Sequence, residues 1–93
     1  MFDEVLQKMR LSVQAGKFLL TSHAYDEMNF DDLFVVDLEN CILTGDIMTR
    51  QWDDDFGEWK YVIHGDGQSE EEMAVVAKLD YNNCVVVITT FRL

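Results

Sequence analysis

The hydrophobic pattern of this chain changes period near Asp46, and this change constrains the fold more than any other feature. Before Asp46 the apolar residues recur every three or four positions, which is typical of helices that bury one face. After Asp46 they alternate or form short runs between turn-type residues, which is typical of strands. Helices followed by hairpin-linked strands predict an α+β fold, with N-terminal helices packed on one face of an antiparallel sheet. A chain of 93 residues has room for one domain, over residues 1–93.

The N-terminal region predicts one helix and one extended segment. Residues 2–15 carry apolar side chains at helical spacing, with Asp3 as a candidate N-cap and Gly16 as a natural terminator. The short apolar run at 17–21 is predicted to be extended.

Two further helices are predicted before the change of period. Ser22 is a candidate N-cap for a short helix over residues 23–28, and Asp31 or Asp32 would cap a longer one over residues 33–43. The FVV run in the longer helix would suit a strand in isolation, but the capping acids and the glycine that follows favour a helix. The residues predicted to share its apolar face are Phe34, Leu38, Cys41 and Ile42.

The second half of the chain predicts a four-stranded antiparallel sheet. The four strands are expected at residues 46–52, 58–64, 73–80 and 84–93. The turn-type clusters that separate them lie at residues 53–57, 65–72 and 82–83.

A two-residue turn at 82–83 would set the register of the last hairpin. Tyr81 would then oppose Cys84, and Ile88 would point into the core. The opposite face of the sheet would gather the cationic side chains Lys60, His64 and Lys78. The register of the first hairpin leaves open whether Arg50 joins them.

The chain is strongly acidic, with 18 Asp and Glu against seven Lys and Arg and a net charge of −11. This charge favours solubility and repels phosphate backbones, so the expected partner is a basic protein rather than a nucleic acid. The acidic N-terminus and the lack of a long apolar run predict no signal peptide, no membrane segment and a cytoplasmic location. Cys41 and Cys84 are accordingly expected to be reduced thiols.

One candidate for chemistry is the pair formed by His23 and Glu27, which lie four positions apart and would share a helix face. The two side chains could be a general acid and base or two metal ligands. A contact that merely orders the helix is the favoured interpretation.

The other candidate is the cationic sheet face of Lys60, His64 and Lys78, beside Tyr61. In a metal-free ribonuclease, the cations would stabilise the charge that develops on phosphorus, and His or Tyr would move protons. Tyr61 alternates with the other residues, however, and should point into the core. A solvated sheet face is the favoured interpretation.

The acidic loops predict neither a metal site nor a cofactor. Residues 53–58 contain only a fragment of a calcium-binding loop and stand where a hairpin turn is needed. Residues 70–72 are expected to form a solvated loop. The chain contains no phosphate-binding loop, dinucleotide-binding motif or nucleophile elbow.

Four blocks of sequence follow one another: TSHAYDEM at 21–28, DLENCILTGDI at 37–47, GEWKYVIHG at 57–65 and VVVITTF at 85–91. In this order and spacing they resemble the bacterial family called domain of unknown function 4258. That family is grouped with RelE-like and BrnT-like toxins of toxin–antitoxin modules. The resemblance therefore implies a RelE-like architecture, with helices on an antiparallel sheet whose open face can hold RNA.

Two hypotheses for function follow. Members of the family commonly carry an arginine where this chain has Asp26-Glu27-Met28, and the toxins are basic whereas this chain is acidic. The favoured hypothesis is a non-catalytic or weakened module that binds a basic or antitoxin-like protein. The alternative is a metal-independent endoribonuclease toxin acting on mRNA. Its candidate catalytic residues are His23, Glu27, Lys60 and His64, and its candidate binding residues are Arg50 and Lys78.

Overall fold

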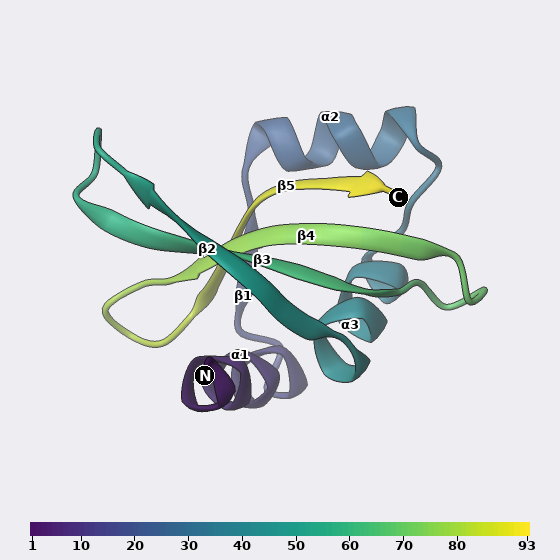
Figure 1. The fold of residues 1–93 in the computed structure, drawn as a ribbon. Helices are drawn as coiled ribbons and strands as arrows, with labels where there is room; N and C mark the ends of the chain where they lie inside the picture. Colours follow the sequence, from purple (N-terminus) through teal and green to yellow (C-terminus); the bar gives the residue numbers. More distant parts are fainter.

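The computed structural model describes residues 1–93, the whole chain, as three helices and five strands. In chain order the elements are α1 (Asp3–Gln14), β1 (Phe18–Leu20), α2 (Ser22–Phe30), α3 (Val35–Thr44), β2 (Asp46–Asp53), β3 (Glu58–Asp66), β4 (Glu72–Leu79) and β5 (Val85–Arg92). The strands form one sheet in the order β1-β5-β4-β3-β2 (Figure 1). The α+β class and the change from helices to strands at Asp46 are confirmed.

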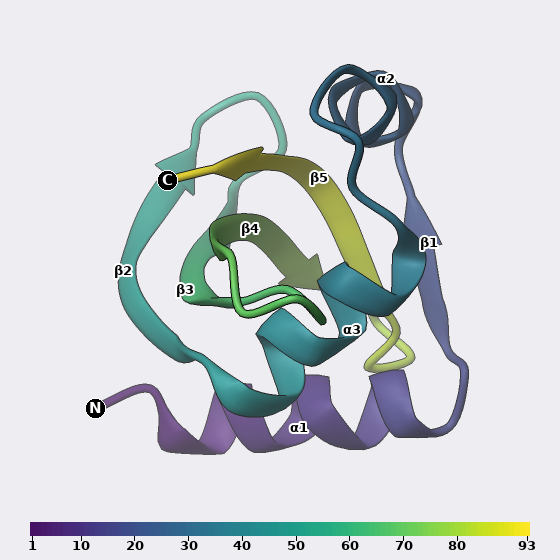
Figure 2. The same ribbon diagram turned by 90° about the vertical axis from the view of Figure 1, so that its right-hand side faces the viewer.

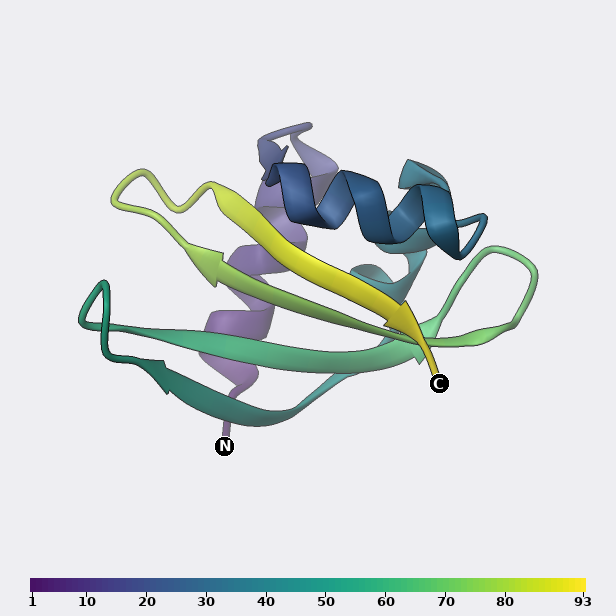
Figure 3. The same ribbon diagram turned by 90° about the horizontal axis from the view of Figure 1, so that it is seen from above.

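The three helices lie together on one side of the sheet, as the view in Figure 3 shows. The sheet is strongly twisted, so β2 and β5 run in different directions when viewed along the strands (Figure 2). The space between helices and sheet is filled by a core of 14 buried residues. Its fully buried members with the largest side chains include Met9, Leu38, Ile42, Ile63, Met73 and Val87.

The sheet has five strands and is mixed, so the prediction of a four-stranded antiparallel sheet is wrong. β2, β3, β4 and β5 pair as antiparallel neighbours, but β1 pairs in parallel with β5, with Phe18 opposite Val85 and Leu20 opposite Val87. The sequence indicated an extended segment here. Three apolar residues carry no sign of which distant strand they will join, and that choice is made by tertiary packing.

The C-terminal end of α1 and the N-terminal end of α2 follow ordinary capping rules, whereas the N-cap of α1 is Phe2, which makes no capping hydrogen bond. Gly16 has φ +73° directly after the C-cap of α1, as its terminating role requires. Thr21, and not Ser22, is the N-cap of α2, because its Oγ1 accepts a hydrogen bond from the Ala24 amide at 3.1 Å. Asp3 lies inside the first turn of α1 and does not cap it.

The acids at 31 and 32 end α2 and do not cap α3, which corrects the predicted start of that helix. Asp31 is the C-cap of α2, and Asp32 has φ +55°. The Leu33 amide then donates to the Met28 carbonyl at 2.8 Å, which completes a Schellman-type end. The helix α3 begins two residues later, at Val35.

The register of the last hairpin is also shifted from the prediction. Asp80 accepts hydrogen bonds from the amides of Asn82 at 2.8 Å and Cys84 at 2.9 Å, and this closes a three-residue loop. Leu79 therefore opposes Val85, and Val87 is the buried residue. Ile88 is unpaired at a register shift and only half-buried, so the prediction that it points into the core is wrong.

Candidate functional site

His23 and Glu27 form a surface pair on α2. The His23 Nε2 and Glu27 Oε1 atoms are 3.9 Å apart, and the two side chains are 64% and 38% exposed. The helix packs against β5 and β1 within the helical layer. The pair is therefore exposed to solvent, but it lies on the helical side of the sheet and not on the face that the helices leave open.

Lys60 and Lys78 lie together on the face of the sheet that the helices leave open. Tyr61 opposes Ala77, so Lys60 and Lys78 occupy the next position along β3 and β4. The Lys60 Nζ is 4.0 Å from the Asp53 carboxylate. Lys78 forms an ion pair with Glu58, and its Nζ lies 5.0 Å from the centre of the Phe56 ring.

His64 is on the same face as Lys60 but about 13 Å further along β3, at roughly 3.3 Å per residue. It opposes Asp46 on β2 and Ala74 on β4. A shallow pocket of about 230 Å³ lies beside it, lined also by Gly65, Asp66, Glu72 and Leu93. The lysines and the histidine are too far apart to act on the same atom.

Arg50 lies on the opposite face of the sheet from Lys60. It opposes Tyr61, whose ring packs toward α1 at 5.9 Å from the centre of Phe2. The Arg50 guanidinium stacks over Trp59 at 3.8 Å from the ring centre. The first hairpin thus keeps Arg50 away from the two lysines, and Tyr61 faces the core as expected.

Sequence reasoning missed a cluster of exposed apolar side chains where α2 meets α3. Phe30 is 86% exposed, Phe34 67%, Val36 48% and Val35 37%. These four residues are referred to below as the α2–α3 corner. Phe34 was predicted to share the buried face of the helix with Leu38. It is the N-cap instead, with φ −116° and ψ 165°, so its side chain leaves the helical phase and points outward.

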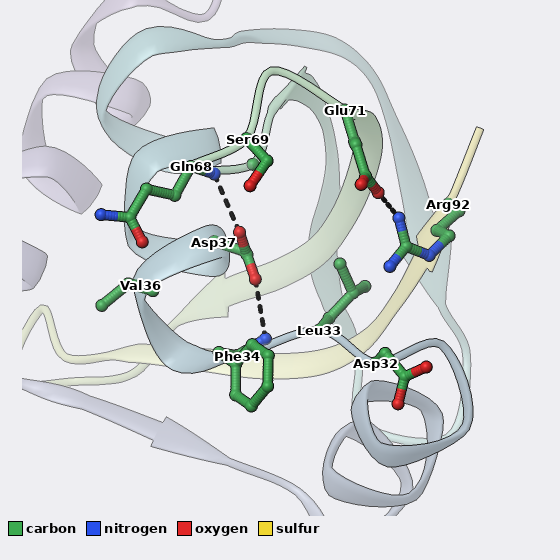
Figure 4. Close-up of a pocket in the computed structure, with 10 residues that line it drawn as sticks. Asp32, Leu33, Phe34, Val36, Asp37, Gln68, Ser69, Glu71 and Arg92 are labelled. Atoms are coloured by element: carbon green, nitrogen blue, oxygen red, sulfur yellow. Dashed lines mark hydrogen bonds and ion pairs between the residues drawn. The ribbon is translucent and has the colours of Figure 1, made fainter.

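A pocket of about 260 Å³ lies between the α2–α3 corner and the loop that joins β3 to β4. Its apolar lining comes from Leu33, Phe34 and Val36, and the β3–β4 loop supplies Gln68 and Ser69. Figure 4 shows the Leu33 side chain between Asp37 and Arg92. The pocket therefore joins an apolar wall to a polar one.

The polar groups of this pocket already have partners within the chain. The Asp37 carboxylate accepts from the Phe34 amide at 2.9 Å and from the Gln68 amide at 2.8 Å (Figure 4). Arg92 forms an ion pair with Glu71, and its Nε donates to the Asp31 carbonyl at 2.8 Å. Asp37 is thus a structural link between α3 and the loop rather than a free acid or base.

The remaining ionisable candidates are the cysteines and possible metal ligands. Burial, and to a lesser extent the Asp66 carboxylate, raise the pKa of the Cys41 thiol to about 12, so this thiol is a neutral core group. Burial also raises the pKa of Cys84, with Asp80 acting in the same direction and Lys17 opposing it. No cluster of three or more His, Cys, Asp or Glu is arranged to hold a metal ion. No helix is long and apolar enough to cross a membrane.

The comparisons with known proteins agree with the resemblance seen in the sequence. The family described as a domain of unknown function (DUF4258) matches residues 20–92, which span every element from α2 to β5. No curated protein and no solved structure matches the chain. Because the match covers well over half of its length, the chain belongs to the DUF4258 family.

Proposed function

We propose that this chain is a non-catalytic protein-binding module. The observation that carries the proposal is the α2–α3 corner, where Phe30 and Phe34 are 86% and 67% exposed. Exposed apolar side chains are ordinary when they are scattered. Here four of them lie within seven consecutive residues, and Phe34 and Val36 line a pocket, which is typical of an interaction site. Water solvates such a cluster poorly, so covering it with a partner is favourable.

The alternative, a ribonuclease toxin, requires cations that are free to hold phosphates. Lys60 lies beside the Asp53 carboxylate, and Lys78 lies beside the Glu58 carboxylate. An RNA phosphate would have to displace these carboxylates against the field of a net charge of −11. The open face of the sheet therefore offers RNA little attraction.

The other cations are also engaged within the chain. Lys8 lies 3.6 Å from Glu4, and Arg92 is paired with Glu71. Arg10 donates to the Ile42 and Gly45 carbonyls at 3.1 Å and 2.7 Å. Arg50 stacks on Trp59, so Lys17 is the one cation without an ion pair, stacking contact or side-chain hydrogen bond. Lys17 lines a pocket together with Lys8, whose ammonium already lies beside Glu4, and one unpaired lysine is no phosphate-binding surface.

The acid/base candidates are separated from these cations. His23 and Glu27 lie on α2, in the helical layer, whereas Lys60 and Lys78 lie on the open side of the sheet. General acid–base catalysis needs the proton-transfer groups within hydrogen-bond reach of the reacting atoms. Groups on opposite sides of a sheet cannot surround one phosphodiester, which supports a module without ribonuclease activity.

We also propose that the chain is a bacterial cytoplasmic protein related to the RelE-like and BrnT-like toxins, and that its nuclease activity is absent or weakened. Its partner is a basic or antitoxin-like protein. The sequence of α2 supports the loss of nuclease activity, because Asp26, Glu27 and Met28 stand where members of the family commonly have an arginine.

The test separates module from toxin by growth. The native chain is expressed from an inducible promoter in bacteria, beside a His23→Ala, Lys60→Ala double variant of matched abundance and folding. The module predicts equal growth of both cultures and intact mRNA. Growth arrest by the native chain that the double variant relieves would refute the proposal and establish the toxin.

A further inference from the structure

We propose that the partner binds the α2–α3 corner through a segment in which a large apolar side chain is flanked by Lys or Arg. The apolar side chain enters the pocket beside Leu33, Phe34 and Val36, and the cations lie over the surrounding carboxylates. This inference rests on the proposed protein-binding function. It adds the surface and the chemistry of the partner.

Phe34 occupies the N-cap of α3. N-cap positions favour Ser, Thr, Asp and Asn, whose side chains can accept a hydrogen bond from the first turn. Phe34 cannot accept one, and its ring is 67% exposed, so it contributes neither a cap nor much core packing. Phe2, the N-cap of α1, also makes no capping bond, but its ring packs on Tyr61, whereas the Phe34 ring is exposed. Departures from local rules without a structural gain are expected at functional sites.

The pocket is small for a site that binds a free metabolite. Pockets for small-molecule ligands have volumes of about 300–1,000 Å³. This pocket has about 260 Å³ and is lined on one side by Leu33, Phe34 and Val36. It suits a single large side chain supplied by a protein better than it suits a free metabolite.

The chain segments that form the pocket are acidic. Residues 31–39 and 66–72 supply every lining residue except Arg92 and carry eight carboxylates and no Lys or Arg, and the carboxylates of Asp32, Asp37 and Glu71 belong to the lining itself. The one ion pair among them is Glu71 with Arg92. A basic segment would complement this rim, whereas a second copy of the chain, an anionic membrane or a nucleic acid would be repelled.

Hydrogen bonds hold the site in shape before any partner binds. Asp37 links the start of α3 to the Gln68 amide at 2.8 Å. The Asn40 side-chain amide donates to the Asp66 carbonyl at 2.9 Å and the Gly67 carbonyl at 3.2 Å. Both walls of the pocket are thus fixed to each other, and a preorganised site loses less entropy on binding.

The experiment uses synthetic peptides as probes of defined chemistry. The first peptide has a central Leu flanked by Lys on both sides, the second replaces Leu by Ser, and the third replaces Lys by Glu. Each is titrated into the native chain, a Phe34→Ser, Val36→Ser variant and a Tyr81→Ser control. Tyr81 is 106% exposed and lies in the β4–β5 loop, at the other end of the strands from the pocket.

The proposal predicts that the Lys–Leu–Lys peptide binds the native chain and the Tyr81→Ser control equally. Replacing the Leu of the peptide by Ser, or Phe34 and Val36 of the chain by Ser, should weaken binding about tenfold. The Glu peptide should not bind, and added salt should weaken binding of the Lys peptide.

Binding that is unaffected by Phe34→Ser, Val36→Ser would refute the α2–α3 corner as the binding surface, and equal binding of the Lys and Glu peptides would refute a basic partner. No detectable binding of any peptide would also overturn the inference, whereas failure of the proposed function is read separately, as growth arrest.

Discussion

Gly45 and Gly65 contact each other backbone to backbone and hold the end of α3 directly on β3. A Cβ atom on Gly65 would lie 2.7 Å from the Cys41 carbonyl oxygen and 3.0 Å from the Gly45 Cα. A Cβ on Gly45 would lie 2.4 Å from the His64 carbonyl. The two distances to carbonyl oxygens are shorter than atoms can approach without moving the backbone. The helix and the strand can therefore meet this closely only where both residues lack a side chain.

Gly65→Ala should destabilise the fold by about 1–3 kcal/mol, the usual cost of forcing an extra methyl group into a packed interface. The obstacle is backbone, which cannot rotate away as a flexible side chain can. Chemical denaturation measures the loss. Ser69→Ala, in the exposed loop nearby, is the control and should change the free energy of unfolding by less than about 0.5 kcal/mol. Equal stability of the two variants would show that α3 and β3 are further apart than described.

Arg10 stabilises the C-terminal end of α3 from the neighbouring helix. Its Nε and Nη2 donate to the carbonyls of Ile42 and Gly45, which have few partners at a helix end. Arg10→Met keeps most of the aliphatic stem and should cost about 1.5–3 kcal/mol, the range for hydrogen bonds to charged groups. Lys8→Met removes only an exposed pair with Glu4 and should be nearly neutral by the same urea titration. A neutral Arg10→Met would mean that water replaces the guanidinium at no cost.

The register of the last hairpin makes Val87 more important to stability than Ile88, although Val is the smaller residue. Val87 is fully buried, whereas Ile88 is half-buried and unpaired at the register shift. Val87→Ala should cost about 2 kcal/mol, and Ile88→Ala should cost less. Thermal unfolding of the two variants compares them directly. A larger loss of stability for Ile88→Ala would contradict this register and support the one with a two-residue turn, in which Ile88 points into the core.

Cys41 makes stability depend on pH in the alkaline range. Burial raises its pKa from 9.0 to about 12, so the folded chain keeps this proton when the unfolded chain has lost it. The contribution is complete below pH 9 and is lost as pH rises from 9 toward 12, by about 1.4 kcal/mol for each pH unit. Urea unfolding between pH 8 and 10.5 should show a shallower decline for Cys41→Ala than for the native chain. Cys84→Ala, at a less buried thiol, should keep most of the slope, and identical slopes for native chain and Cys41→Ala would contradict this account.

The sequence predicts the element types well because periodicity is a local property. The helices and the four longer strands all occur, and Gly16 ends α1 as its position indicates. What local patterns could not decide is the role of Asp31 and Asp32. Both acids are good N-caps and also tolerate a helix end, so the same letters fit either the start of α3 or the end of α2. The left-handed conformation of Asp32 decides the matter, and residue type alone does not encode it.

The candidate site was harder to predict for a related reason. Phe34 stands four positions before Leu38, which on a regular helix would put both in the core. Its extended backbone at the N-cap breaks that phase and turns the ring outward. Similarly, the pairing of Lys60 with Asp53 depends on the first hairpin, whose register the sequence left open, and the pairing of Lys78 with Glu58 depends on the register of β4 against β3. The cations can be counted from a sequence, but which of them are paired with carboxylates depends on the fold.

The central claim is that the α2–α3 corner binds a protein, and site-specific photocrosslinking in the cells that naturally contain the chain tests it most directly. A benzophenone amino acid replaces Phe34 in one strain and Tyr81 in another. Both are exposed aromatic residues, but Phe34 lines the pocket beside the β3–β4 loop, whereas Tyr81 lies in the β4–β5 loop. The account predicts one discrete covalent adduct to a basic protein from position 34 and none from position 81. No adduct from position 34, or the same adducts from both positions, would contradict it.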